Sequence, residues 1–181
     1  MKKKKLFTTR TLVSSALLSA MSIVFARLLV IWITPSVRIS FGNIPIMMAG
    51  IMFGPVAGIL VGAVADTVGA AFLSPYGWYA PLTVGPMLAG LIPALLRSQI
   101  LRKTNYLRVL RTVLLTNVIS SMAYTTWVLS GYNGTPIGAL LAARIPLYTC
   151  ISFVEAVVIL LLIKSPLMRA AGIGIIGGDK H

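Results

Sequence analysis

The chain has 181 residues, of which 57% are apolar and only 10% are charged, and its formal net charge is +13. A soluble domain carries about 25% charged residues, so this composition excludes a soluble globular protein and a disordered one. One cysteine excludes a disulfide framework, and one histidine, at the last position, excludes a histidine-based metal site. At about 20 residues a span, the length allows five or six membrane helices and no soluble catalytic domain.

Apolar runs and the breaks between them predict an all-α integral membrane protein with a bundle of six transmembrane helices. The six runs cover residues of about 12–33, 43–54, 55–74, 82–101, 107–130 and 136–164. The second run is too short to span a bilayer, so we expect a short or re-entrant-like helix inside the bundle. Polar and apolar residues alternate over 36–41, which predicts a short strand or an ordered cap on the outer face.

The basic residues are concentrated at the ends of the apolar runs and in the gaps between them. Thirteen of the sixteen lie there, and such placement indicates a membrane topology rather than a nucleic-acid partner. With a cytoplasmic N-terminus and six crossings, the positive-inside rule places all thirteen in the cytoplasm and leaves only Arg38 in an outer loop. We therefore expect a basic N-terminus at 1–11, a membrane domain at 12–164 and a tail at 165–181, with both ends in the cytoplasm.

Small residues recur every four positions at Gly50, Gly54, Gly58 and Gly62. This spacing lets helices approach closely in lipid, so packing within the bundle is the favoured interpretation.

Ionisable residues inside the membrane are costly and indicate a functional site. Asp66 lies about 16 Å from the predicted inner surface and Glu155 about 13 Å, from a rise of about 1.5 Å per residue. Arg27 and Arg144 fall nearer the outer surface, and Arg38 lies in the outer loop. Arginines outside and carboxylates deeper suit a ligand that is anionic at its outer end and carries a hydrogen-bond-donating heterocycle at its inner end.

Aromatic residues near the outer end, among them Trp78 and Tyr79, suit a flat ligand, although such residues also form interfacial belts. Arg27 and Arg144 have the alternative of snorkelling to headgroups, and Asp66 that of pairing with an arginine. Glu155 is either structural or faces a partner. The sequence has no GxxxxGK[ST], HExxH or CxxC motif and no Ser/His pair, so we predict no catalytic residue and no metal site.

The stretch from residue 37 to 90 resembles the folate-family S components of energy-coupling factor (ECF) transporters. Four elements carry the resemblance: RISFG-x-IPI, in which x is Asn43; AG-x-x-FGP; G-x-x-x-G-x-x-x-D, which ends at Asp66; and the Pro-x-Thr that follows the aromatic residues 78–79. The similarity is detailed over about a third of the chain and extends to the six-helix layout of the whole.

The resemblance implies a vitamin-binding membrane subunit that is not an enzyme and has no cofactor apart from its transported ligand, folate. Its partners would be a transmembrane T component and two cytoplasmic ATPases. An alanine motif on the first helix contacts the T component, and Ala16 and Ala20 match it. Arg27 lies seven residues after Ala20, on nearly the same helical face unless the helix bends. The loop over 34–42 would cover the vitamin.

The ligand-binding residues proposed on this basis are Arg38, Arg144, Asp66, Arg27, Trp78, Tyr79 and Asn43. Three alternatives remain. The first is an S component for another vitamin, such as pantothenate, riboflavin or a pyrimidine precursor, although three arginines favour an acidic ligand. The second is a self-sufficient proton-coupled carrier that uses Asp66 and Glu155. The third is a membrane enzyme or a structural subunit.

Overall fold

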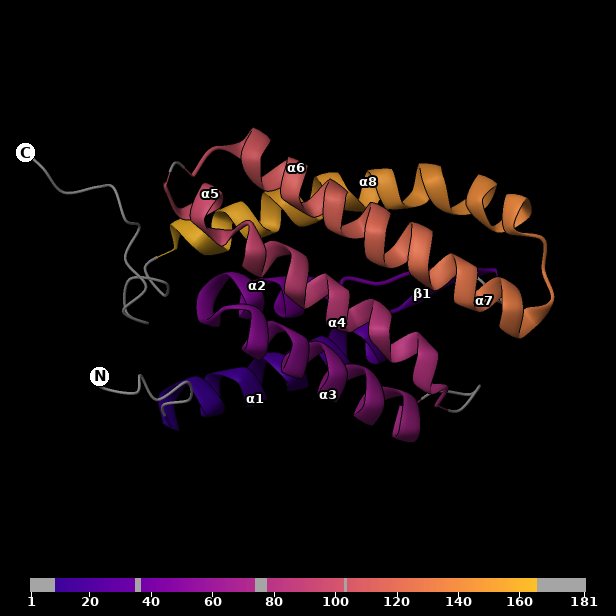
Figure 1. Cartoon of the computed structure of the whole chain (residues 1–181), viewed down its shortest axis with the longest axis horizontal. Helices are drawn as coiled ribbons and strands as arrows, with labels where there is room; N and C mark the ends of the chain where they lie inside the picture. The colour runs from indigo at the N-terminus through magenta and orange to yellow at the C-terminus, as the bar shows by residue number, and fades with distance from the viewer. Residues whose placement is uncertain (1–8, 35–36, 74–77, 103, 166–181) are drawn as a thin grey trace, which may run out of the picture.

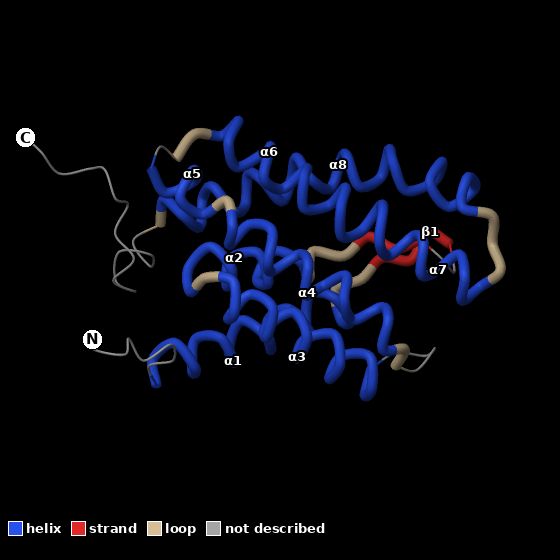
Figure 2. Tube along the Cα trace, in the orientation of Figure 1, coloured by secondary structure: helices blue, strands red, loops and turns tan. Residues whose placement is uncertain are grey.

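A computed structural model describes residues 9–34, 37–73, 78–102 and 104–165 of the chain, without the side chains of 32–34, 37–38 and 133. Most of the predicted basic N-terminus and nearly all of the tail, 1–8 and 166–181, lie outside it. The described residues form seven helices and one two-stranded antiparallel sheet (Figure 2). Four of the helices are long and apolar enough to cross a membrane, and two apolar helices are shorter.

The elements follow one another as α1 (Thr9–Ile23), η1 (Val24–Leu28), β1 (Ile31–Thr34), β2 (Val37–Ile39), α2 (Asn43–Phe53), α3 (Pro55–Leu73), α4 (Ala80–Leu95), α5 (Arg97–Arg102), α6 (Tyr106–Thr116), η2 (Asn117–Tyr124), α7 (Thr125–Asn133) and α8 (Ile137–Lys164). The two η segments are π-helical turns. The first continues α1, and the second joins α6 to α7 in one long helix.

Two predicted boundaries are wrong. The first helix ends at Leu28 rather than residue 33, because Leu29 leaves the helical conformation and Ile31–Thr34 forms β1. The run at 82–101 is broken at Leu96 into α4 and α5, so the helices number seven rather than six in the described part. The helical class is confirmed, with one small sheet added: a hairpin pairs Trp32 with Arg38 in its register, and β2 confirms the strand expected within 36–41.

The short helix α2 is buried among the others, as its length predicted. One set of its side chains, including Met47 and Ile51, packs with α5, α6 and α8 in the larger apolar cluster. Ile46 and Ala49 pack instead with Val61 of α3 in the second cluster. A helix that is apolar all round has no polar face to give to solvent, so burial on every side is the arrangement its sequence favours.

The break between α2 and α3 is set by Gly54 and Pro55. Gly54 has φ +96°, a conformation that side-chain-bearing residues rarely adopt. Pro55 has no N–H and is tolerated in the first turn of the helix that follows. The two residues therefore end one helix and begin the next.

The glycine series brings α2 and α3 against the backbone of α4. A Cβ on Gly50 or Gly58 would collide with the carbonyl oxygen of Gly90, and one on Gly62 would collide with the carbonyl of Pro86. These three glycines confirm the packing interpretation. Because glycine has no Cβ, the helices approach more closely at this contact than larger residues would allow.

Successive helices run in opposite directions, so their ends gather at two ends of the molecule (Figure 1). The start of α1, the α2–α3 junction, α5 and the end of α8 lie at one end, which we call the basic end because Arg10, Arg97, Arg102, Arg108 and Lys164 belong to it. The end of α3, the start of α4 and the α7–α8 connection lie at the other.

We predict that Gly90→Ala lowers the free energy of unfolding by about 2 kcal/mol or more, because overpacking a tight contact forces backbone shifts. Thermal unfolding of the detergent-solubilised chain measures this. Gly138→Ala is the matched control, since nothing lies within 4 Å of a Cβ at that helical position. The control should be neutral or slightly stabilising. Equal stability of the two variants would contradict the close-contact account.

Candidate functional site

A polar cluster centred on Asp66 joins α1, α3 and α4. Thr83 Oγ1 donates to Asp66 Oδ2 at 2.9 Å, and Trp78 Nε1 donates to Thr83 Oγ1 at 3.1 Å. Arg27 Nη2 donates to Asp66 Oδ1 at 3.4 Å. The side chains of Arg27 and Asp66 are 9% and 15% exposed, so the ion pair is largely buried. The pairing of Asp66 with an arginine, left open by the sequence, is the arrangement observed.

The π-helical turn Val24–Leu28 brings Arg27 to this cluster. In it the N–H of Leu29 bonds to the carbonyl of Val24 at 3.1 Å, five residues back. The wider turn changes which face the following residues occupy, compared with a regular α-helix. Ala16 and Ala20 are exposed, while Arg27 lies against Gly69 of α3. The helix therefore separates two faces that a regular α-helical period would have merged.

The aromatic residues predicted for the site lie beside this cluster. Trp78 is half exposed and Tyr79 is 39% exposed. The ring of Tyr79 lies 4.9 Å from that of Tyr132, centroid to centroid, which links the start of α4 to α7. Tyr124 donates to the carbonyl of Pro81 at 3.1 Å and ties η2 to the same turn. Partly exposed aromatic faces next to a carboxylate are suited to a flat ligand with hydrogen-bond donors.

Arg144 does not join the Asp66 cluster among the contacts described. It is only 6% exposed, and its Nη1 donates to the carbonyl of Ser121 at 3.3 Å and to Thr126 Oγ1 at 3.2 Å. Both acceptors of Arg144 belong to or follow the π-helical turn η2. The hydroxyls of Thr125 and Thr126 also donate to carbonyls of this turn, each five residues back in the chain. Arg144 thus holds α8 against η2, and its guanidinium is buried rather than snorkelling outward.

Glu155 is fully buried and binds within the bundle rather than facing a partner. Asn117 Nδ2 donates to Glu155 Oε2 at 2.7 Å and to Ser152 Oγ at 2.9 Å. Its other oxygen, Oε1, has no hydrogen-bond partner among the described residues. The cluster joins η2 to α8, and of the two interpretations it supports the structural one.

The remaining predicted residues are less well defined. Asn43 begins α2 and is partly buried. The side chain of Arg38 lies outside the described part of the chain, although its backbone is paired in β2. Ala16 and Ala20 lie on the exposed face of α1, opposite the buried Ser15 and Ser19.

Two residues were not predicted from the sequence: Thr83, which binds Asp66, and Asn117, which binds Glu155. Thr83 was present in the Pro-x-Thr element without being given a role, and Asn117 is a lone amide in an apolar run, which is itself a signal of a buried polar contact. Among the described residues no three potential metal ligands come together. The hydrogen bonds and charges of the Asp66 cluster are suited to binding and orienting a polar ligand.

We expect Arg27→Gln and Asp66→Asn to be coupled in a double-mutant cycle. Each single change removes one of the two charges of a partly buried ion pair, and contacting residues couple by about 0.5–3 kcal/mol. The double variant should therefore lose less unfolding free energy than the sum of the single losses. Arg102→Gln combined with Asp66→Asn is the control pair, because Arg102 lies at the basic end and should be additive. Additivity in both pairs would show that the ion pair contributes nothing.

Comparison with known proteins extends over most of the chain. The family model for the ECF-type riboflavin transporter, S component, matches residues 6–171. A folate transporter, FolT, from Clostridium novyi (strain NT) is 32% identical over 146 residues, which is 80% of this chain and 82% of the relative.

Two solved structures have the same architecture. The crystal structure of FolT bound with folic acid matches with a TM-score of 0.74 and 25% identity, over 86% of this chain and 93% of that one. The S component for biotin from an ECF-type ABC transporter matches with a TM-score of 0.64 and 20% identity, over 87% and 92%, and shows the fold alone. The chain belongs to the S-component family of ECF transporters, and is thus a multi-pass membrane protein of transport and not an enzyme.

Proposed function

We propose that this chain captures folate as the substrate-binding subunit of an ATP-driven ECF importer. Two matches carry the choice of ligand: the relative at 32% identity is a folate transporter, and the structure matched at 25% identity holds folic acid. The family implies association with a T component and ATPases. The finer assignment, one T component and two cytoplasmic ABC ATPases, is part of this proposal, as is a location in the cytoplasmic membrane.

The chemistry of the Asp66 cluster supports this ligand. Folate has a dianionic glutamate tail and a pterin with a hydrogen-bond-donating aminopyrimidinone edge. Asp66 offers carboxylate oxygens to such an edge, and its contact with Arg27 is long at 3.4 Å, which makes it the part of the cluster that a ligand displaces. Trp78 and Tyr79 offer aromatic faces for the pterin, Arg38 and Arg144 are the proposed partners of the tail carboxylates, and Asn43 is a further proposed ligand contact.

A second ligand class is retained because the family model carries riboflavin in its description. Riboflavin is neutral and gives the arginines no carboxylate to bind, so the proposal ranks it second. Pantothenate and a pyrimidine precursor rank below riboflavin. The self-sufficient proton-coupled carrier loses support, since the S-component family implies association with a T component and ATPases.

The orientation in the membrane is proposed from the positions of the basic residues. Those at the helix ends gather at one end of the molecule, at the starts of α1 and α6 and at the end of α8 (Figure 1). By the positive-inside rule this end faces the cytoplasm, and both termini would lie there. The Asp66 cluster, which lies toward the other end, would then face the source of the vitamin.

Binding is tested by intrinsic fluorescence of the purified chain in detergent, with folate, riboflavin and pantothenate titrated separately and corrected for absorbance. We expect selective quenching by folate, with Trp78 as the main reporter because it belongs to the Asp66 cluster. Trp78→Phe should remove most of the signal, whereas Trp127→Phe, at an exposed position on α7, should leave it. Selective binding of riboflavin would overturn the ligand and keep the family.

Arg38→Ala should weaken folate binding by about 1.5–3 kcal/mol, the range for a hydrogen bond to a charged group. Isothermal titration with folate measures the change. Arg102→Ala removes the same charge at the basic end and serves as the control, with an expected affinity close to that of the unchanged chain. An unaltered affinity in Arg38→Ala would remove Arg38 from the site.

Ala16→Trp and Ala20→Trp should leave folate binding intact and abolish uptake. Both residues are exposed on α1, away from the buried serine face, so a bulky side chain there blocks docking of the T component without disturbing the bundle. Uptake is measured in vesicles that contain the chain together with its T component and ATPases. Normal uptake by either variant would refute the docking assignment.

A further inference from the structure

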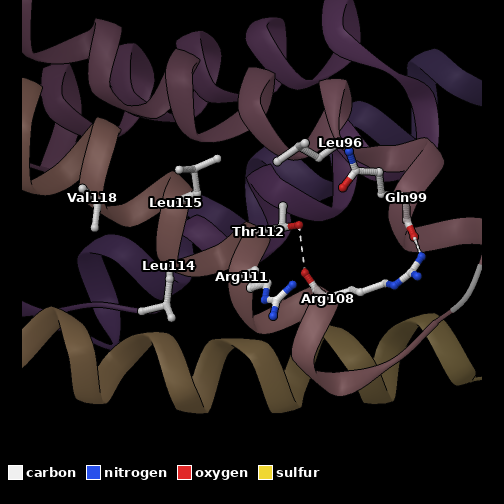
Figure 3. A pocket seen from close by; sticks show the side chains of 8 residues that line it. All are labelled: Leu96, Gln99, Arg108, Arg111, Thr112, Leu114, Leu115 and Val118. Carbon is white, nitrogen blue, oxygen red and sulfur yellow. Dashed lines mark hydrogen bonds between the residues drawn. The ribbon is translucent and has the colours of Figure 1, made fainter.

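A groove of about 770 Å³ lies at the basic end, between the end of α4 with α5 on one side and α6 on the other (Figure 3). Arg108 and Arg111 line one part of the groove together with the polar Gln99 and Thr112. The other four lining residues are aliphatic: Leu96, Leu114, Leu115 and Val118. The vitamin site proposed above uses none of these residues.

The positive charge of the groove has no protein counterion in the part of the chain that the structure describes. Arg108 and Arg111 are three positions apart on α6 and both are exposed. Arg108 Nη1 donates to the carbonyl of Gln99 at 3.2 Å, which fixes its guanidinium at the mouth of the groove. The two carboxylates among these residues, Asp66 and Glu155, are bonded elsewhere. Each guanidinium keeps N–H donors that suit a phosphate.

The aliphatic part of the groove continues from the arginines along α6 toward the middle of the bundle. Leu115 and Val118 follow Arg111 by four and seven residues, or about 6 Å and 10 Å along the helix. Both are 46% exposed. A ligand that fills the groove must therefore be anionic at one end and apolar for at least 10 Å beyond it.

We propose that this groove binds one anionic phospholipid, with its phosphate on Arg108 and Arg111 and an acyl chain along Leu115 and Val118. Basic pockets between membrane helices at the cytoplasmic side bind anionic headgroups in this way. A free phosphate would leave the aliphatic part unused. The T component is proposed to dock on α1, which lies on the far side of α2 and α4 from α6 (Figure 1), so it does not cover the groove.

The test is native mass spectrometry of the full chain in detergent, titrated with palmitoyl-oleoyl phosphatidylglycerol and with the phosphatidylcholine of the same acyl chains. We expect one phosphatidylglycerol to be retained preferentially. The double variant Arg108→Gln with Arg111→Gln should weaken its binding about tenfold or more. Arg102→Gln with Lys164→Gln removes the same charge from exposed sites at the same end, and should change binding less than about twofold.

Two further arms identify the occupant. Leu115→Trp keeps the charge and fills the aliphatic part, so it should also weaken lipid binding, and soluble glycerol 3-phosphate should not displace the lipid. Equal retention of the two lipids, equal losses in the two double variants, or displacement by glycerol 3-phosphate would each overturn the proposal. An unchanged melting temperature checks that each variant is folded, independently of whether folate is the vitamin.

Discussion

The structure depends on the close approach of α2 and α3 to α4, in which the carbonyl of Gly90 occupies the space that side chains on Gly50 and Gly58 would fill. Apolar burial does not distinguish protein from lipid tails, so van der Waals contact between closely placed backbones is what holds such helices together. The same approach sets the distance between Asp66 on α3 and Thr83 on α4, and so the hydrogen bond that orders the candidate site. Both the stability of the bundle and the geometry of the candidate site therefore depend on this contact.

Two π-helical turns then place the buried arginines. In a regular α-helix each carbonyl is bonded four residues on, whereas a π-helical turn shifts the pattern by one residue and changes the face. At the first turn Arg27 contacts Asp66, while Ala16, earlier on α1, is exposed. The second gives the carbonyl of Ser121 to Arg144. Each turn is a local departure from the regular helix at a point where an arginine bonds to a neighbouring helix.

Much of the arrangement follows from local sequence. Gly54-Pro55 predicts a break between helices, because glycine adopts positive φ values and proline has no N–H to continue a helix. Glycines four residues apart indicate a close contact between helices. The end of the first helix at Leu28 was missed, because the apolar run continues through the strand that follows. The partner of Glu155 was missed for another reason: Asn117 lies 38 positions away, and only the packing of η2 on α8 brings them together. A local sequence pattern does not show which residues face one another on helices that are far apart in the chain.

The two buried carboxylates can be assigned different roles from their surroundings. Glu155 is fully buried and accepts a short bond of 2.7 Å from Asn117, so displacing that donor would leave a buried carboxyl oxygen without a hydrogen bond. Asp66 is 15% exposed and its bond to Arg27 is 3.4 Å long. In the function proposed above, Asp66 is therefore the carboxylate at which a ligand donor would replace the contact with Arg27, whereas Glu155 holds η2 against α8.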